Sequence, residues 1–136
     1  MSEEMITVDN LSQELLKQVF DGAYMQVFTD NQGDIYVQDR CKCWLFPDKE
    51  KRHIRLHAQF GFKPDSSDLQ RLECVNMINR GWLIVRATVG KNNALIFNYD
   101  VSLDGGISRK YLVLLVKRFC SIPHDAVSDC GKDIVE

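Results

Sequence analysis

The sequence predicts an α+β fold, a mostly antiparallel sheet with helices at the N-terminus, in the middle and at the C-terminus. Segments of alternating apolar and polar residues are joined by short turns rich in Gly, Asn and Asp, which indicates hairpins and antiparallel strand pairing. Segments with apolar residues at helical spacing precede, separate and follow these strands. The predicted order is one helix, three or four strands, a helix, two strands and a last helix.

The first helix is expected after Asn10 or Ser12, because either side chain can accept hydrogen bonds from the free N–H groups of a first turn. Gly22 is expected to end this helix. Its apolar residues recur at helical spacing: Leu11, Leu15, Leu16, Val19 and Phe20.

The next segments are predicted to be strands. Residues 25–29 and 35–38 flank the turn at residues 30–34, whose Asp, Asn and Gly tolerate positive φ. A third strand is predicted at residues 41–46, and a polar loop at residues 47–51. The fourth strand has apolar residues facing one way and polar residues facing the other: Ile54, Leu56, Ala58 and Phe60 against His53, Arg55, His57 and Gln59.

The second half repeats this alternation of helix and strand. A helix capped within residues 65–68 is expected to bury Leu69, Leu72, Val75 and Ile78 and to end at residues 80–81. Asn76 and Asn79 interrupt it, either bonding to nearby backbone or lying at the edge of the buried stripe. Strands at residues 82–89 and 94–101 and a helix at residues 108–120 follow. That last helix has one apolar stripe: Tyr111, Leu112, Leu115, Val116 and Phe119.

We expect a single domain over residues 1–136, with its core at about residues 10–120 and a flexible tail at residues 121–136. The formal net charge of -2 argues against a broad nucleic-acid footprint. The N-terminus lacks a signal-peptide pattern, and the longest apolar run, residues 112–116, is too short to cross a bilayer. Five scattered cysteines then favour reduced thiols and a cytoplasmic location.

Two residue pairs are candidates for metal or thiol chemistry. Cys41 and Cys43 point to the same face of a strand, but burial as small apolar side chains is the favoured interpretation. His53 and His57 also share a strand face, yet four residues span about 13 Å, too far for both to bind one metal directly. A metal- or thiol-dependent enzyme using these four residues stays open as an alternative.

No catalytic, cofactor-binding or metal-binding residue is assigned, and no cofactor is expected. Ser66, Ser67 and Ser108 stand where helices begin and are expected to be caps rather than nucleophiles. A second alternative is weak nucleic-acid binding through the basic run at residues 49–55. That run is interrupted by Glu50 and lacks the interleaved aromatic residues of single-strand binders, which favours a solvated loop.

Exposed apolar residues predict an interaction surface. Val113 and Leu114 lie off the main stripe of the last helix, so apolar residues spread widely around it. A second layer, a subunit or deep burial could cover them. The candidate partner or dimer surface comprises Tyr111, Val113, Leu114, Arg55 and His57.

Four stretches in a fixed order carry a family resemblance: residues 30–37, 75–79, 98–100 and 105–107. Together they lie within residues 11–120 and resemble the bacterial YbjN-like family of sensory transduction regulators, whose fold is similar to that of type III secretion chaperones. The resemblance implies a sheet with flanking helices, commonly paired as a homodimer, that binds a protein or peptide partner. It implies no catalytic residues, so the leading expectation is a non-enzymatic binding or regulatory protein.

Overall fold

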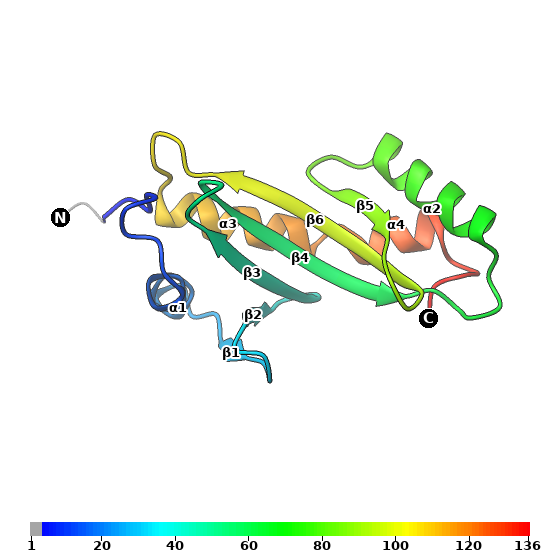
Figure 1. Ribbon diagram of the computed structural model, residues 1–136, viewed down its shortest axis with the longest axis horizontal. Coiled ribbons are helices and arrows are strands. Elements are labelled where there is room, and N and C mark those ends of the chain that lie inside the picture. Colours follow the sequence, from blue (N-terminus) through cyan, green and yellow to red (C-terminus); the bar gives the residue numbers. More distant parts are fainter. Residues whose placement is uncertain (1–3) are drawn as a thin grey trace.

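The computed structural model describes residues 4–136, in which six strands form one antiparallel sheet of order β1-β2-β3-β4-β6-β5 (Figure 1). This confirms the predicted fold class. The long strands β4 and β6 pair over nine residues at the centre of the sheet. The strands are β1 (Val27–Thr29), β2 (Ile35–Gln38), β3 (Lys42–Asp48), β4 (His53–Gly61), β5 (Arg86–Val89) and β6 (Ala94–Ser102). The helices of the described residues are α1 (Gln13–Gly22), α2 (Asp68–Gly81), α3 (Arg109–Cys120) and α4 (Pro123–Cys130).

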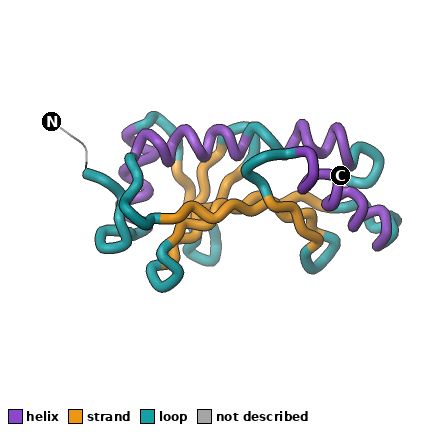
Figure 2. Tube along the Cα trace, turned by 90° about the horizontal axis from the view of Figure 1, so that it is seen from above, coloured by secondary structure: helices purple, strands orange, loops and turns teal. Residues whose placement is uncertain are grey.

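The helices α1, α3 and α4 lie on one face of the sheet, and α2 lies beside the edge strand β5 (Figures 1 and 2). The opposite face has no helix over it in the described residues. In Figure 1 the strands β3, β4 and β6 pass in front of α3, so that view looks onto the uncovered face. Alternate strand residues point toward the helices and form the core with them, which is the period-2 pattern that the sequence predicts. The largest side chains of this core include Phe20, Leu45, Leu56, Phe97 and Phe119.

The hydroxyls of Ser12, Ser67 and Ser108 cap three of the helices, as predicted. The cap predicted for Ser66 is wrong, because its hydroxyl donates to the carbonyl of Lys63. Ser12 accepts a hydrogen bond from the N–H of Leu15 at 3.0 Å, and Ser108 accepts one from Tyr111 at 3.0 Å. Ser67 and Gln70 form a reciprocal capping box at the start of α2. These bonds satisfy N–H groups that the first helical turn leaves free.

The buried stripe predicted for α2 is wrong in its first half. Leu69 and Leu72 are 65% and 57% exposed. The residues that α2 buries are Arg71, Cys74, Val75 and Ile78. These four residues have helical spacing, but the first of them, Arg71, is charged. A search for apolar residues at helical spacing therefore does not identify it as buried.

Two strand boundaries also differ from the prediction. β3 continues through Pro47 and Asp48, which pair with β4. Proline has no N–H to donate, but β2 pairs with β3 only as far as Leu45, so no strand lies beside Pro47 on the β2 side to need that donor. The strand predicted from residue 82 begins only at Arg86, after Ile84 with a φ of 76°. A left-handed residue breaks the extended conformation that a strand requires.

The tail expected to fray forms α4 and then returns to the sheet. Ile122, Pro123 and Ala126 are buried, and α4 packs against α2. Val135 forms an isolated antiparallel bridge with Phe62. Long-range packing orders this segment, although its own apolar content is low.

Candidate functional site

A groove lies between α1 and α3 on the helical side. Its volume is about 240 Å³, and the side chains that line it include no carboxylate. Val19, Ala23, Val113 and Leu114 contribute apolar atoms to it, and Arg109 and Lys110 contribute positive charge. The lining is completed by Gln18 and Gly22. The groove therefore combines an apolar floor with cationic groups.

Exposed apolar side chains lie on α3 and directly after α1, the two helices that form this groove. Leu114 is 54% exposed, and Tyr111 on the same helix is 47% exposed. Tyr24, directly after the end of α1, is 99% exposed with a φ of 62°. Of the residues predicted for a partner surface, Val113 and Leu114 thus line the groove, and Tyr111 lies on the same helix outside this lining. Tyr111 does not join the buried stripe that the sequence also predicted for it.

The other two predicted residues, Arg55 and His57, lie on β4 on the uncovered face of the sheet. His57 belongs to a row of residues that are direct cross-strand partners over the whole sheet: Phe28, Tyr36, Trp44, His57, Asn98 and Arg86. The rings of Phe28 and Tyr36 are stacked with centroids 5.3 Å apart, and Tyr36 and Trp44 are 5.1 Å apart. The row therefore changes from aromatic at β1 to polar and basic at β5.

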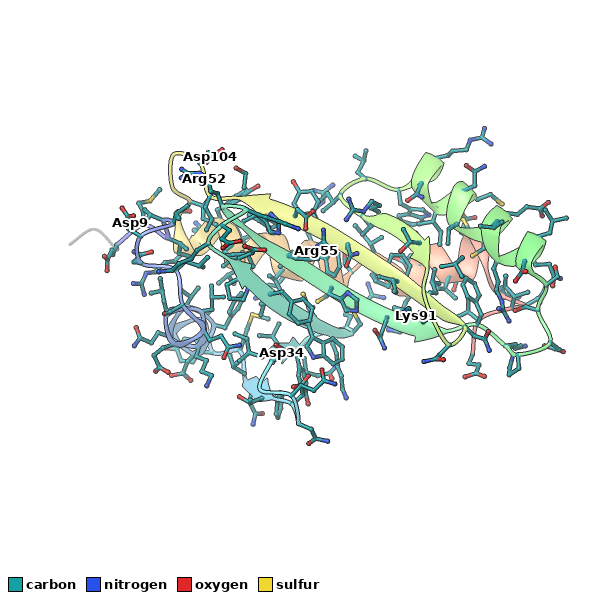
Figure 3. The ribbon with its side chains drawn as sticks, in the orientation of Figure 1. Asp9, Asp34, Arg52, Arg55, Lys91 and Asp104 are labelled. Carbon is teal, nitrogen blue, oxygen red and sulfur yellow. The ribbon has the colours of Figure 1, made fainter. Side chains whose placement is uncertain are left out.

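A charge cluster occupies the basic half of this face. Arg55 donates two hydrogen bonds to the carboxylate of Asp100, at 2.7 and 3.1 Å (Arg55 is labelled in Figure 3). Arg86 and His53 approach the same carboxylate at 3.7 and 4.0 Å. The Arg55 guanidinium holds the pKa of Asp100 below its usual value, and Asp100 in turn raises the pKa of Arg55.

A pocket of about 340 Å³ occupies the aromatic half. The rings of Trp44 and Phe46 lie 6.2 and 5.7 Å from the His57 ring in edge-on arrangements. The two ring nitrogens of His57 lie 3.0 Å from Asn98 Oδ1 and 3.0 Å from Gln59 Oε1, which hold the ring in place. The remaining lining comes from the turn between β1 and β2: Asp30, Asn31, Gln32 and Asp34.

Asp30 connects that turn to the sheet. Its Oδ2 accepts a hydrogen bond from Trp44 Nε1 at 3.0 Å, and its Oδ1 accepts from the backbone N–H groups of Gln32 and Asp34. The Trp44 hydrogen bond is the main reason that the pKa of Asp30 is lowered. Asp30 thus stabilises both the turn and the position of the indole ring.

The cysteine and histidine pairs do not form one site, because they lie on opposite faces of the sheet. Cys41 and Cys43 are 6% and 0% exposed on the helical side, which confirms that they are buried. The neighbouring Cys120 thiol and burial together raise the pKa of Cys41 well above its ordinary value. Over residues 4–136 no group of three His, Cys, Asp or Glu side chains could hold a metal ion.

The basic run at residues 49–55 contributes few unpaired cations to one surface. Arg52 donates to Asp104 at 2.7 Å, and the two residues are labelled next to each other in Figure 3. Arg55 pairs with Asp100. Sequence reasoning missed the aromatic row because its members come from separate strands. The sequence does show that Phe28, Tyr36 and Trp44 alternate with apolar neighbours, which indicates that each faces away from the core. Only the register between the strands makes them direct neighbours in one row.

No helix in residues 4–136 is long and apolar enough to cross a membrane.

Comparisons with known proteins agree with this architecture. A family model for YbjN, described as "Putative bacterial sensory transduction regulator", matches residues 12–130. The crystal structure of YbjN, "a putative transcription regulator from E. coli", is 15% identical, with a TM-score of 0.76 and coverage of 98% of this chain and 99% of that chain.

The second similar structure is the Yersinia pestis type III secretion chaperone SycH in complex with a stable fragment of YscM2. It is 17% identical, with a TM-score of 0.55 and coverage of 85% of this chain and 96% of that chain. No curated protein matches the sequence. Because the family model spans most of the chain, this protein belongs to the YbjN family.

Proposed function

We propose that the chain is a non-enzymatic regulatory module that binds a protein or peptide partner in the groove between α1 and α3. The observation that carries this proposal is an uncovered apolar groove with two cationic residues and no acidic lining. An apolar segment with acidic side chains complements such a surface in both respects.

The residues of α3 support this choice of partner. The helix carries Arg109, Lys110, Lys117 and Arg118 and no acidic residue. Leu114 stands exposed among these cations and would lose contact with water when a partner binds. Burial of an apolar side chain supplies affinity, and the surrounding charges supply specificity and faster association.

The family and fold also favour a binding role. The family description is that of a regulator, and the similar chaperone SycH was crystallised with a fragment of another protein. Catalysis by the four Cys and His candidates is disfavoured, because the sheet separates the two pairs. Five free thiols, four of them buried, are compatible with action in the cytoplasm.

Nucleic-acid binding is disfavoured by the geometry of the aromatic row. Single-strand binders present ring faces on which bases stack. Here the face of Phe28 is stacked against Tyr36 with an interplanar angle of 19°, so these two rings occupy each other's faces. The two best-placed arginines, Arg52 and Arg55, are engaged by carboxylates.

Self-association is part of the proposal. A second copy seated on α3 would cover Tyr111 and Leu114, and pairing would then compete with the peptide partner. Light scattering at increasing protein concentration tests this homodimer. A monomer at all concentrations would contradict pairing and leave the groove open to the peptide partner.

Fluorescence anisotropy with synthetic peptides tests the groove directly. We expect an amphipathic Leu/Glu peptide to bind with a Kd on the order of micromolar, and a Leu/Lys peptide of equal length at least about tenfold more weakly. Leu114→Asp and Lys110→Glu should each weaken Leu/Glu binding by about tenfold or more.

Two variants on other surfaces are matched controls. Leu69→Asp changes a leucine on α2 that is 65% exposed, against 54% for Leu114. Lys91→Glu makes the same charge change as Lys110→Glu far from the groove. Both should bind the Leu/Glu peptide like the unmodified protein. Equal binding of the two peptides, or equal loss in the control variants, would refute the groove as the site.

A further inference from the structure

The pocket on the uncovered face of the sheet has a composition that differs from that of the groove. Three rings, those of Trp44, Phe46 and His57, converge on about 340 Å³ of space. Two carboxylates, Asp30 and Asp34, stand on one wall, and no lysine or arginine is among the lining residues. Figure 3 shows Asp34 beside the hairpin of β1 and β2.

These carboxylates have no cationic partner among the residues that the structure describes. Asp30 accepts from the Trp44 indole and from two backbone N–H groups, and neither Asp30 nor Asp34 forms an ion pair within residues 4–136. Elsewhere on the same face, Asp100 has two arginines, Arg55 and Arg86, and the imidazole of His53 within 4.0 Å. The negative charge of this pocket is thus left unmatched by the cations of the described residues, in contrast to that of Asp100.

We propose that this pocket binds an arginine side chain of a peptide partner. A guanidinium group is planar, so it can lie against the Trp44 or Phe46 ring and donate paired hydrogen bonds to a carboxylate. Asp34 is the proposed ion-pair partner, because its side-chain oxygens make no hydrogen bond within the described residues. Asp30 acts indirectly, by fixing the turn and the indole ring.

The pocket and the groove are separate contacts, since they lie on opposite faces of the sheet. The inference rests on the proposed function in one respect, namely that the natural ligand is a peptide. A small arginine probe does not depend on that assumption, so the pocket can be tested even if the groove proposal fails.

Two-dimensional ¹H–¹⁵N NMR offers a direct readout. The sequence contains two tryptophans, so the Trp44 indole N–H reports on the pocket and the Trp82 indole N–H is an internal control. Titration with N-acetyl-arginine amide should shift the Trp44 signal saturably, with a Kd on the order of millimolar. The neutral isostere N-acetyl-citrulline amide should shift it far less.

Asp34→Asn keeps the shape of the side chain and removes its charge. It should weaken arginine-amide binding by about fivefold or more, an effect that added salt should diminish. Asp65→Asn, an exposed aspartate at a distance, is the matched control and should bind normally. Leu114→Asp should leave this titration unchanged.

Three outcomes would overturn the inference: no saturable shift of the Trp44 indole, an equal response to citrulline amide, or unchanged affinity in Asp34→Asn. A folded spectrum of each variant, recorded in the same experiment, separates loss of binding from loss of structure. Loss of peptide binding in Leu114→Asp with retained arginine-amide binding would separate the two sites.

Discussion

The side chain of Asn79 in α2 pairs with both backbone groups of Ala87 in the edge strand β5. Asn79 Nδ2 donates to the carbonyl of Ala87 at 3.0 Å, and the N–H of Ala87 donates to Asn79 Oδ1 at 2.7 Å. An edge strand presents unpaired N–H and C=O groups to which another chain can add. The Asn79 amide occupies these groups and closes part of this edge.

Replacing Asn79 tests this role. Asn79→Ala should lower the free energy of unfolding by about 1–2 kcal/mol, because two backbone groups lose their partners. The opened edge should also increase self-association. Urea unfolding and light scattering measure the two effects. Asn76→Ala, an exposed asparagine one turn earlier, should change neither, and equal effects in both variants would contradict the assignment.

Arg71 is a second test of tertiary packing. It is 8% exposed and donates to Ser66 Oγ at 2.8 Å, Asn93 Oδ1 at 2.8 Å and the carbonyl of Lys63 at 3.2 Å. Arg71→Met should destabilise the fold by about 2–3 kcal/mol, since the three partly buried hydrogen bonds of the guanidinium are lost. Thermal unfolding measures the effect, and the exposed Arg80→Met should stay within about 0.5 kcal/mol of the unmodified protein.

The Asp100 carboxylate predicts acid sensitivity. Its pKa is lowered from 3.8 in the folded chain, mainly by Arg55, so its ionised form stabilises the fold. This contribution is complete above the pKa of the unfolded chain and is lost as the pH falls through the lower folded-state value. Urea unfolding between pH 7 and about 2 should show this loss, and Asp100→Asn should be less stable at pH 7 and less sensitive to acid.

Asp104→Asn is the control for Asp100→Asn. Asp104 pairs with Arg52 in an exposed position, with 70% and 57% of the two side chains accessible. Such surface pairs contribute little, so this variant should resemble the unmodified protein within about 0.5 kcal/mol. A pH profile of Asp100→Asn parallel to that of the unmodified protein would refute the role given to Asp100.

The thiols should differ in their reactivity. Burial raises the pKa of Cys74 to about 11, and Cys41, Cys43 and Cys120 are buried as well. Cys130 is partly exposed. Iodoacetamide at pH 8 should therefore label Cys130 first in the folded protein and all five thiols in denaturant, as mass spectrometry can measure. Rapid labelling of Cys41 or Cys43 in the folded state would contradict the burial.

Local patterns in the sequence predicted most of the elements because their causes are local. Alternation marks β4, serine caps mark the starts of α1, α2 and α3, and turn residues mark the hairpin of β1 and β2. The errors fall where distant contacts decide. α2 buries Arg71 instead of Leu69 because acceptors from two loops surround the guanidinium, and α4 is ordered by contacts with α2 rather than by a strong pattern of its own.

For the candidate sites, the sequence by itself determined the residue types and the helix face that carries Leu114. It also determined that Arg55 and His57 share one side of a strand, because side-chain direction alternates along a strand. Only the tertiary structure decided that Trp44, His57 and Asp34 meet at one pocket and that Cys41 and His57 lie on opposite faces. Register between strands depends on pairing over long sequence separations, and such pairing leaves no mark within a single segment.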